Sequence, residues 1–118
     1  MISQEKAQEL AQDWIDSWNS HDIDRILSHY SNEILFTSPF VVKLLGDNSG
    51  TIQSKTGLKS YFMKGLEAYP DLKFELYQTL TGVNSITLYY KTVNDMLAAE
   101  VMEIDSDGKI ARVIAHYK

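Results

Sequence analysis

The sequence predicts an α+β fold in which helices come first and a curved antiparallel sheet follows. Apolar residues recur at helical spacing over most of the chain before Leu72, and from Leu72 onward the apolar period changes to two. Two short connections rich in aspartate, asparagine and glycine, Asn94–Asp95 and Asp105–Gly108, separate three long strands, as is typical of an antiparallel meander. With 118 residues and no visible linker or repeat, we expect a single domain, residues 1–118.

Three helices are predicted from the apolar spacing and from capping residues. Ser3 can cap the first helix, and Asp22 can cap a short second one. The apolar face of the first helix consists of Ala7, Leu10, Ala11, Trp14, Ile15 and Trp18, and that of the second of Ile23, Ile26, Leu27 and Tyr30. A third helix carries Leu58, Tyr61, Phe62, Gly65, Leu66 and Tyr69. This helix must end before Pro70.

The predicted strands fall into an early group and a late group. Ser31–Asn32 reads as a break after the second helix, and the first strand then covers Ile34–Phe40, with Pro39 at its end. A short strand over Thr51–Ser54 follows a loop. The late strands are Leu72–Tyr77, Val83–Val93, Met96–Ile104 and Lys109–Tyr117.

Charge and composition exclude several functional classes. The formal net charge is -5 with no basic patch, a balance that repels phosphate backbones, so we expect no nucleic-acid partner. No signal peptide or membrane-length apolar run is visible, which predicts a cytoplasmic protein without membrane contact. The chain has no cysteine, its three histidines lack metal-ligand spacing, and no glycine-rich phosphate loop occurs. We therefore expect neither a metal nor a cofactor.

Glu100 is the most informative single residue. It lies within Met96–Met102, a segment otherwise free of charge, and strand alternation places it on an apolar face with Ala98. A carboxyl group there would be desolvated, which raises its pKa and makes it a candidate general acid or base. Alternatively, this face is solvated at that point, or Glu100 pairs with Arg112 or Lys91 on a neighbouring strand.

Large aromatic side chains could line a cavity. They are Trp14, Trp18, Tyr30, Phe36, Phe40, Tyr61 and Phe62. One interpretation is a bulky core. The other is a ligand pocket, since such pockets are mainly apolar and aromatic with few polar groups.

Three sequence blocks support a family resemblance. They are Trp18–Asp24 followed by Leu27, Tyr30 and Phe36–Pro39; Tyr61–Phe62 with Gly65–Leu66 and Tyr69–Leu72; and Ala99–Ile104 followed by Asp107–Ile110 and Ala115–Tyr117. In order and spacing they resemble the SnoaL-like polyketide cyclases and ketosteroid isomerases of the nuclear transport factor 2-like superfamily. The resemblance implies a cone-shaped sheet wrapped round three helices, an internal cavity, and a dimer formed through the outer sheet face.

The resemblance also suggests site residues. The catalytic aspartate of ketosteroid isomerases falls at Ser38, their oxyanion tyrosine at Trp14, and their second oxyanion acid at Glu100, so one of three roles is retained. Glu100 is therefore the candidate catalytic residue. The candidate ligand-binding residues are Trp14, Trp18, Tyr30, Phe36, Ser38, Phe40, Tyr61, Phe62, Met102 and Tyr117.

Three functions follow as alternatives. The first is a domain that binds a small, mostly apolar or carbonyl-bearing molecule without changing it. The second is a cofactor-free isomerase, cyclase or dehydratase that uses Glu100 as general acid or base. The third is an interaction module with a collapsed cavity, in which protomers pair through the outer sheet face. That face would carry Leu97, Ala99, Val101, Arg112, Ile114 and His116.

Overall fold

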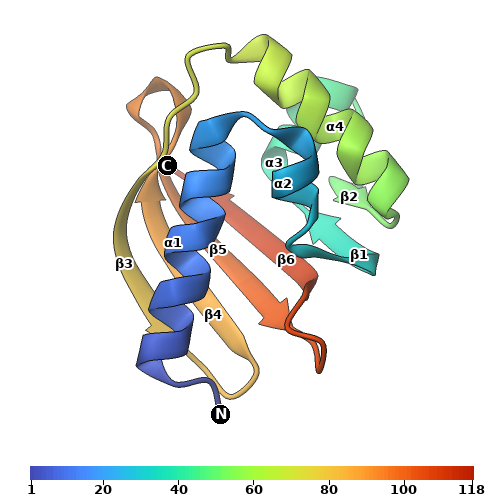
Figure 1. Cartoon of the computed structure of the whole chain (residues 1–118). Helices are drawn as coiled ribbons and strands as arrows, with labels where there is room; N and C mark the ends of the chain where they lie inside the picture. Colours follow the sequence, from blue (N-terminus) through green and yellow to red (C-terminus); the bar gives the residue numbers. More distant parts are fainter.

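The computed structural model describes all residues from Met1 to Lys118 and confirms the α+β fold. One curved, six-stranded sheet has the order β2-β1-β6-β5-β4-β3, and the helices cover one of its faces (Figure 1). The helices are α1 (Gln4–Ser20), α2 (Ile23–Leu27), α3 (Pro39–Leu45) and α4 (Lys55–Ala68), with a 3₁₀ turn η1 (Val93–Asp95). The strands are β1 (Tyr30–Thr37), β2 (Thr51–Ile52), β3 (Glu75–Thr81), β4 (Ser85–Lys91), β5 (Leu97–Ile104) and β6 (Ile110–Tyr117).

The antiparallel meander is confirmed for β3 to β6, and one further pair of strands, β1 and β6, is parallel. Strand β1 lies parallel to β6, with Phe36 opposite Val113, and antiparallel to the short strand β2. A parallel pair between segments so far apart in the chain leaves no turn signal in the sequence. The periodicity therefore predicted both strands but not their pairing.

The region around Pro39 differs from the prediction. The first strand begins at Tyr30 and ends at Thr37, so Ser31–Asn32 lies inside the strand. Ser38 caps a helix that was not predicted: its Oγ accepts a hydrogen bond from the backbone N–H of Phe40, 3.2 Å away, and Pro39 occupies the first helical turn. Serine followed by proline is a strong helix-start signal, which placed Phe40 on α3 rather than on a strand.

Side-chain bonds at the end of α1 delay the start of β3. Asn19 pairs with both backbone groups of Phe74, accepting from its N–H at 2.7 Å and donating to its carbonyl at 3.0 Å. His21 Nε2 lies 2.7 Å from the carbonyl oxygen of Leu72. The predicted strand over Leu72–Tyr77 therefore begins only at Glu75, and the preceding segment is attached to the helix, with Leu72 and Phe74 buried.

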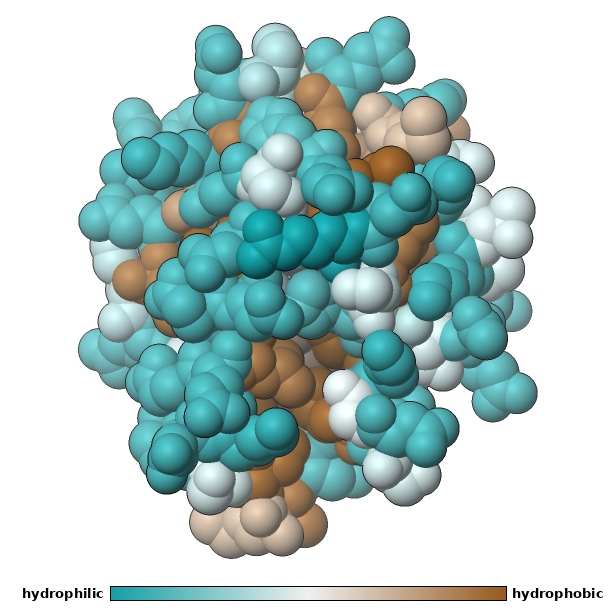
Figure 2. Space-filling model, in the orientation of Figure 1, coloured by the Kyte–Doolittle hydropathy of each residue, from teal (hydrophilic) through white to brown (hydrophobic).

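The core lies between the helices and the concave face of the sheet. Helix α1 contributes the buried residues Ala7, Ala11, Trp14, Ile15 and Trp18, as its spacing predicted. The helix-bearing side of the molecule is mostly hydrophilic, with apolar surface in smaller patches between polar side chains (Figure 2). None of the helices combines the length and the apolar character needed to cross a bilayer.

Candidate functional site

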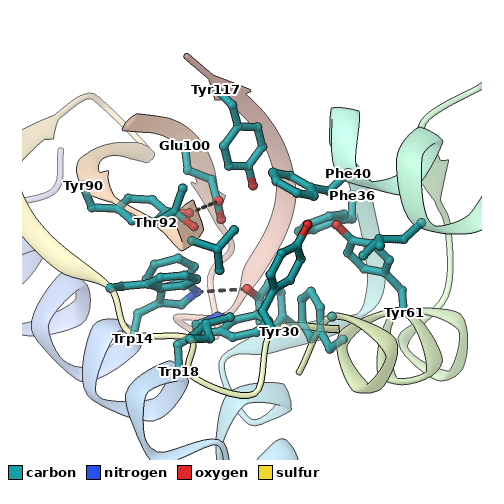
Figure 3. A pocket seen from close by; sticks show the side chains of 17 residues that line it. Trp14, Trp18, Tyr30, Phe36, Phe40, Tyr61, Tyr90, Thr92, Glu100 and Tyr117 are labelled. Carbon is teal, nitrogen blue, oxygen red and sulfur yellow. Dashed lines mark hydrogen bonds between the residues drawn. The ribbon is translucent and has the colours of Figure 1, made fainter. Parts of the chain in front are cut away.

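An apolar cavity lies at the centre of this core (Figure 3). Hydrophobic residues make up 14 of the 17 that line it, so the few polar groups determine what it can recognise. The volume open to the centres of water-sized spheres is about 60 Å³. A cavity needs roughly 10–15 Å³ to hold one water, so this one has room for about four to six water-sized groups. In this conformation it does not have room for several fused rings.

Glu100 carries the only carboxyl group in the cavity lining. Its neighbours on alternate positions of β5, Ala98 and Met102, are buried, and Glu100 itself is 3% exposed. Tyr90, on β4, donates its hydroxyl to Glu100 Oε1 at 2.8 Å. Burial raises the pKa of Glu100 to about 7, and the bond from Tyr90 opposes this rise only in part. Glu100 therefore changes its protonation state near neutral pH.

The predicted alternative in which Glu100 pairs with a cation on a neighbouring strand is wrong. Arg112 instead lies 3.7 Å from Glu103, on the outer side of the sheet, and Lys91 lies 3.3 Å from Glu75 and 3.8 Å from Asp95. Glu100 is neither solvated nor neutralised by a positive charge, and its Oε2 atom forms no hydrogen bond with the protein. An open hydrogen-bonding position thus remains on the carboxyl group.

A second hydrogen-bonded pair lines the same cavity. Trp14 donates its indole N–H to the hydroxyl of Tyr30 at 2.9 Å (Figure 3). Burial, and then the charge of Glu100, raise the pKa of Tyr30, so this phenol stays protonated at any ordinary pH. The nearby indole N–H of Trp18 is buried and has no hydrogen-bond partner. The spacing predicted Tyr30 on the second helix, but the residue lies at the start of β1.

Ser38 lies close to two further phenols, those of Tyr61 and Tyr117. Burial raises the pKa of both Tyr61 and Tyr117, and hydrogen bonding to the Ser38 hydroxyl opposes that rise in each. Ser38 is buried but does not itself line the cavity, and neither does Met102, which is fully covered. The other candidate residues all line it: Trp14, Trp18, Tyr30, Phe36, Phe40, Tyr61, Phe62, Glu100 and Tyr117.

The cavity opens between α3 and α4 on one side and η1 on the other. A larger, more polar hollow shares five of its lining residues, Tyr69, Leu72, Phe74, Thr92 and Val93, so the two are continuous there. Lys43 lies over this region, with Nζ 3.4 Å from the Tyr69 hydroxyl and 5.4 Å from the centre of the Phe40 ring. These mouth residues were not predicted to belong to the site, since most lie in loops or at helix ends.

Tyr90, the hydrogen-bond donor to Glu100, was also not predicted as a site residue. A signal was available: Tyr90 stands on the same face of β4 as Ile86 and Leu88, which are buried. A tyrosine on a buried strand face needs a partner for its hydroxyl, and the adjacent strand offers a carboxyl group. Elsewhere in the chain, no three histidine or acidic side chains come together in a way that could hold a metal ion.

Solved structures share this architecture. A SnoaL-like protein of unknown function from Burkholderia thailandensis is 38% identical, with a TM-score of 0.95 over 99% of this chain and 98% of that one. A proposed isomerase of the SnoaL-like family from Agrobacterium tumefaciens has a TM-score of 0.79 at 14% identity, covering 98% and 99%. An NTF2-like protein of unknown function from Cytophaga hutchinsonii has a TM-score of 0.73 at 13% identity, covering 100% and 95%.

The first of these similarities establishes the family, and the other two show only the fold. The sequence matches no protein-family model and no curated protein. Identity of 38% over almost the full length of both chains nevertheless goes with the same three-dimensional arrangement. The chain therefore belongs to the SnoaL-like proteins of the NTF2-like fold.

Proposed function

We propose that the cavity binds a small, mainly apolar molecule that places one polar group against Glu100. The observation that carries this proposal is the open Oε2 atom of a buried carboxyl group in a cavity otherwise lined by aromatic and aliphatic side chains. Apolar walls with few polar groups are typical of small-molecule sites. The limited volume supports a ligand of about the size of a five-membered cyclic ketone rather than a steroid.

Cyclopentanone is a suitable probe of this binding. Titration should shift the indole N–H resonances of Trp14 and Trp18 in nuclear magnetic resonance spectra, because both side chains line the cavity. Glu100→Gln should change the dissociation constant by about threefold or more, the effect of altering one hydrogen bond. Glu103→Gln, on the outer face of the same strand, should leave the constant unchanged. Uniformly unshifted indole resonances at high ketone concentration would contradict the proposal.

The second candidate function is proton transfer by Glu100. A group with a pKa of about 7 is well matched to general acid–base work near neutral pH. Ser38 cannot replace it, because an unactivated hydroxyl is a poor base, and the indole of Trp14 does not exchange its proton in this range. The chemistry best suited to one such carboxyl group is removal and return of a proton on carbon beside a carbonyl. The isomerase name of the Agrobacterium relative is consistent with this class.

We also propose that the outer sheet face forms a homodimer. In the single chain Leu97, Ala99, Val101 and Ile114 remain half-buried on that face, beside the exposed Arg112 and His116, and apolar side chains on a sheet surface favour a covering partner. Sedimentation at micromolar concentration should give a dimer. Val101→Glu should produce monomers by placing a charge at the contact, whereas Gln8→Glu on the exposed side of α1 should not. A monomeric wild-type protein would refute the dimer without affecting the cavity.

The interaction module without a ligand has less support. It predicted Glu100 in a salt bridge, whereas Lys91 and Arg112, the two cations named for that role, pair with Glu75 and Glu103. Dimer formation is compatible with a functional cavity, so the two proposals can be tested separately.

A further inference from the structure

The cavity and the larger outer hollow meet at a neck, formed by the five residues that line both: Tyr69, Leu72, Phe74, Thr92 and Val93. Leu72 and Phe74 belong to the connection between α4 and β3, which passes the end of α1 and has no regular secondary structure at these positions (Figure 1). By the same measure of volume, the hollow offers about 800 Å³ and the cavity about 60 Å³. A ligand larger than the cavity must therefore extend through the neck.

Side chains at the end of α1 hold one wall of this neck. Asn19 accepts a hydrogen bond from the N–H of Phe74 at 2.7 Å and donates one to its carbonyl at 3.0 Å, which are the two bonds that a neighbouring strand makes in an antiparallel pair. His21 Nε2 lies 2.7 Å from the carbonyl oxygen of Leu72. The backbone at Leu72 and Phe74 is thus fixed by α1.

The ring of Phe74 links this attachment to the cavity. Phe74 is buried, its ring stacks on Trp14 with the ring centres 5.6 Å apart, and its centre lies 4.9 Å from that of Tyr90. Trp14 and Tyr90 are the donors of the two hydrogen-bonded pairs that line the cavity. A change in the position of Phe74 therefore alters both the width of the neck and the packing beside these pairs.

We propose that Asn19 is a specificity-determining residue, which limits the size of the ligand by holding Phe74 in the neck. This inference rests on the proposed binding function and deepens it by assigning the size class, a single small ring. Asn19 does not line the cavity and acts through Phe74, so it is a positioning residue. His21 contributes in the same way through Leu72.

Two ketones of different size test this inference. 2-Indanone is cyclopentanone with a fused benzene ring, so it presents the same carbonyl group and adds apolar area that would ordinarily tighten binding. The wild type should nevertheless bind 2-indanone more weakly, because the neck excludes the second ring. Asn19→Ala releases Phe74 and should shift the ratio of the two dissociation constants in favour of 2-indanone by about tenfold. The indole N–H resonances of Trp14 and Trp18 report both titrations.

Gln4→Ala is the matched control. Gln4 is another amide side chain of α1 that donates to a backbone carbonyl of β3, that of Thr79, at 3.1 Å. Neither residue lines the cavity or the hollow, so the ratio of dissociation constants should keep its wild-type value. A general loss of stability would weaken the binding of both ketones without changing their ratio. The ratio therefore reports the neck alone.

The wild type gives the first decisive result. If it binds 2-indanone as tightly as cyclopentanone, or more tightly, the inference is overturned and the binding proposal stands. An unchanged ratio in Asn19→Ala also overturns the inference. If that variant does not fold, His21→Ala, which releases Leu72, is judged by the same criterion. Binding of neither ketone to the wild type refutes the binding proposal, and the inference falls with it.

Discussion

Glu100→Gln should slow the exchange of the α-hydrogens of cyclopentanone for deuterium by about 10²–10⁴-fold, if the second candidate function holds. Glutamine keeps the size of the side chain and can still accept the hydroxyl of Tyr90, but it cannot take up or release a proton. Proton resonance intensities of the ketone in deuterated buffer measure the exchange directly. Such a probe requires no knowledge of the natural substrate.

The dependence of this exchange on pH provides a second measurement. Glu100 removes a proton only when it is ionised, so the wild-type rate should rise with pH through about 7 and then level off. Glu103→Gln serves as the matched control, since Glu103 lies on the outer side of the same strand, paired with Arg112. Equal exchange rates for wild type and Glu100→Gln would exclude Glu100 as the base. The protein could then still be a binding domain.

The same substitution should make the folded protein more stable above pH 7, by about 3 kcal/mol. Burial raises the pKa of Glu100 from 4.5 to about 7, and each unit corresponds to about 1.4 kcal/mol. Between these values the folded state holds a proton that the unfolded state has lost, so stability falls as the pH rises. Glutamine does not ionise and therefore avoids this loss.

Denaturant unfolding of both proteins at several pH values measures this effect. The difference in unfolding free energy should be small near pH 4.5, grow up to about pH 7 and then remain constant, while other titrating groups cancel between the two proteins. Glu103→Gln should show no such trend, because its carboxyl group is partly exposed. A difference that does not change with pH would mean that Glu100 ionises as readily in the folded state as in water.

Local patterns predicted most of the fold, and the errors lie where two local signals competed. The late strands and helices α1 and α4 follow from apolar spacing, with turn and capping residues marking their ends. At Ser38–Pro39 the apolar alternation favoured a strand, but the capping serine and the proline began a helix. At Phe74 the backbone bonds to Asn19, a partner 55 positions away, which no window of sequence reveals.

The sequence predicted most of the residues that form the candidate site but not the hydrogen bonds between them. Alternation along β5 placed Glu100 on an apolar face, and the structure confirms that placement. The partner of Glu100 comes from β4 and that of Trp14 from β1, so both bonds depend on tertiary packing. Spacing assigned Tyr30 to a helix, but it lies on β1, so its hydrogen bond with Trp14 could not be predicted.

The parallel pairing of β1 with β6 has a consequence for how the chain folds during synthesis. Residues of β1 are translated well before those of β6, the neighbour with which they pair. Contacts between distant parts of a chain form slowly, and until they form, strand edges are open to other molecules. We expect nascent chains lacking β6 to depend on chaperones. The cavity, to which β6 contributes Tyr117, therefore becomes complete only after β6 has joined the sheet.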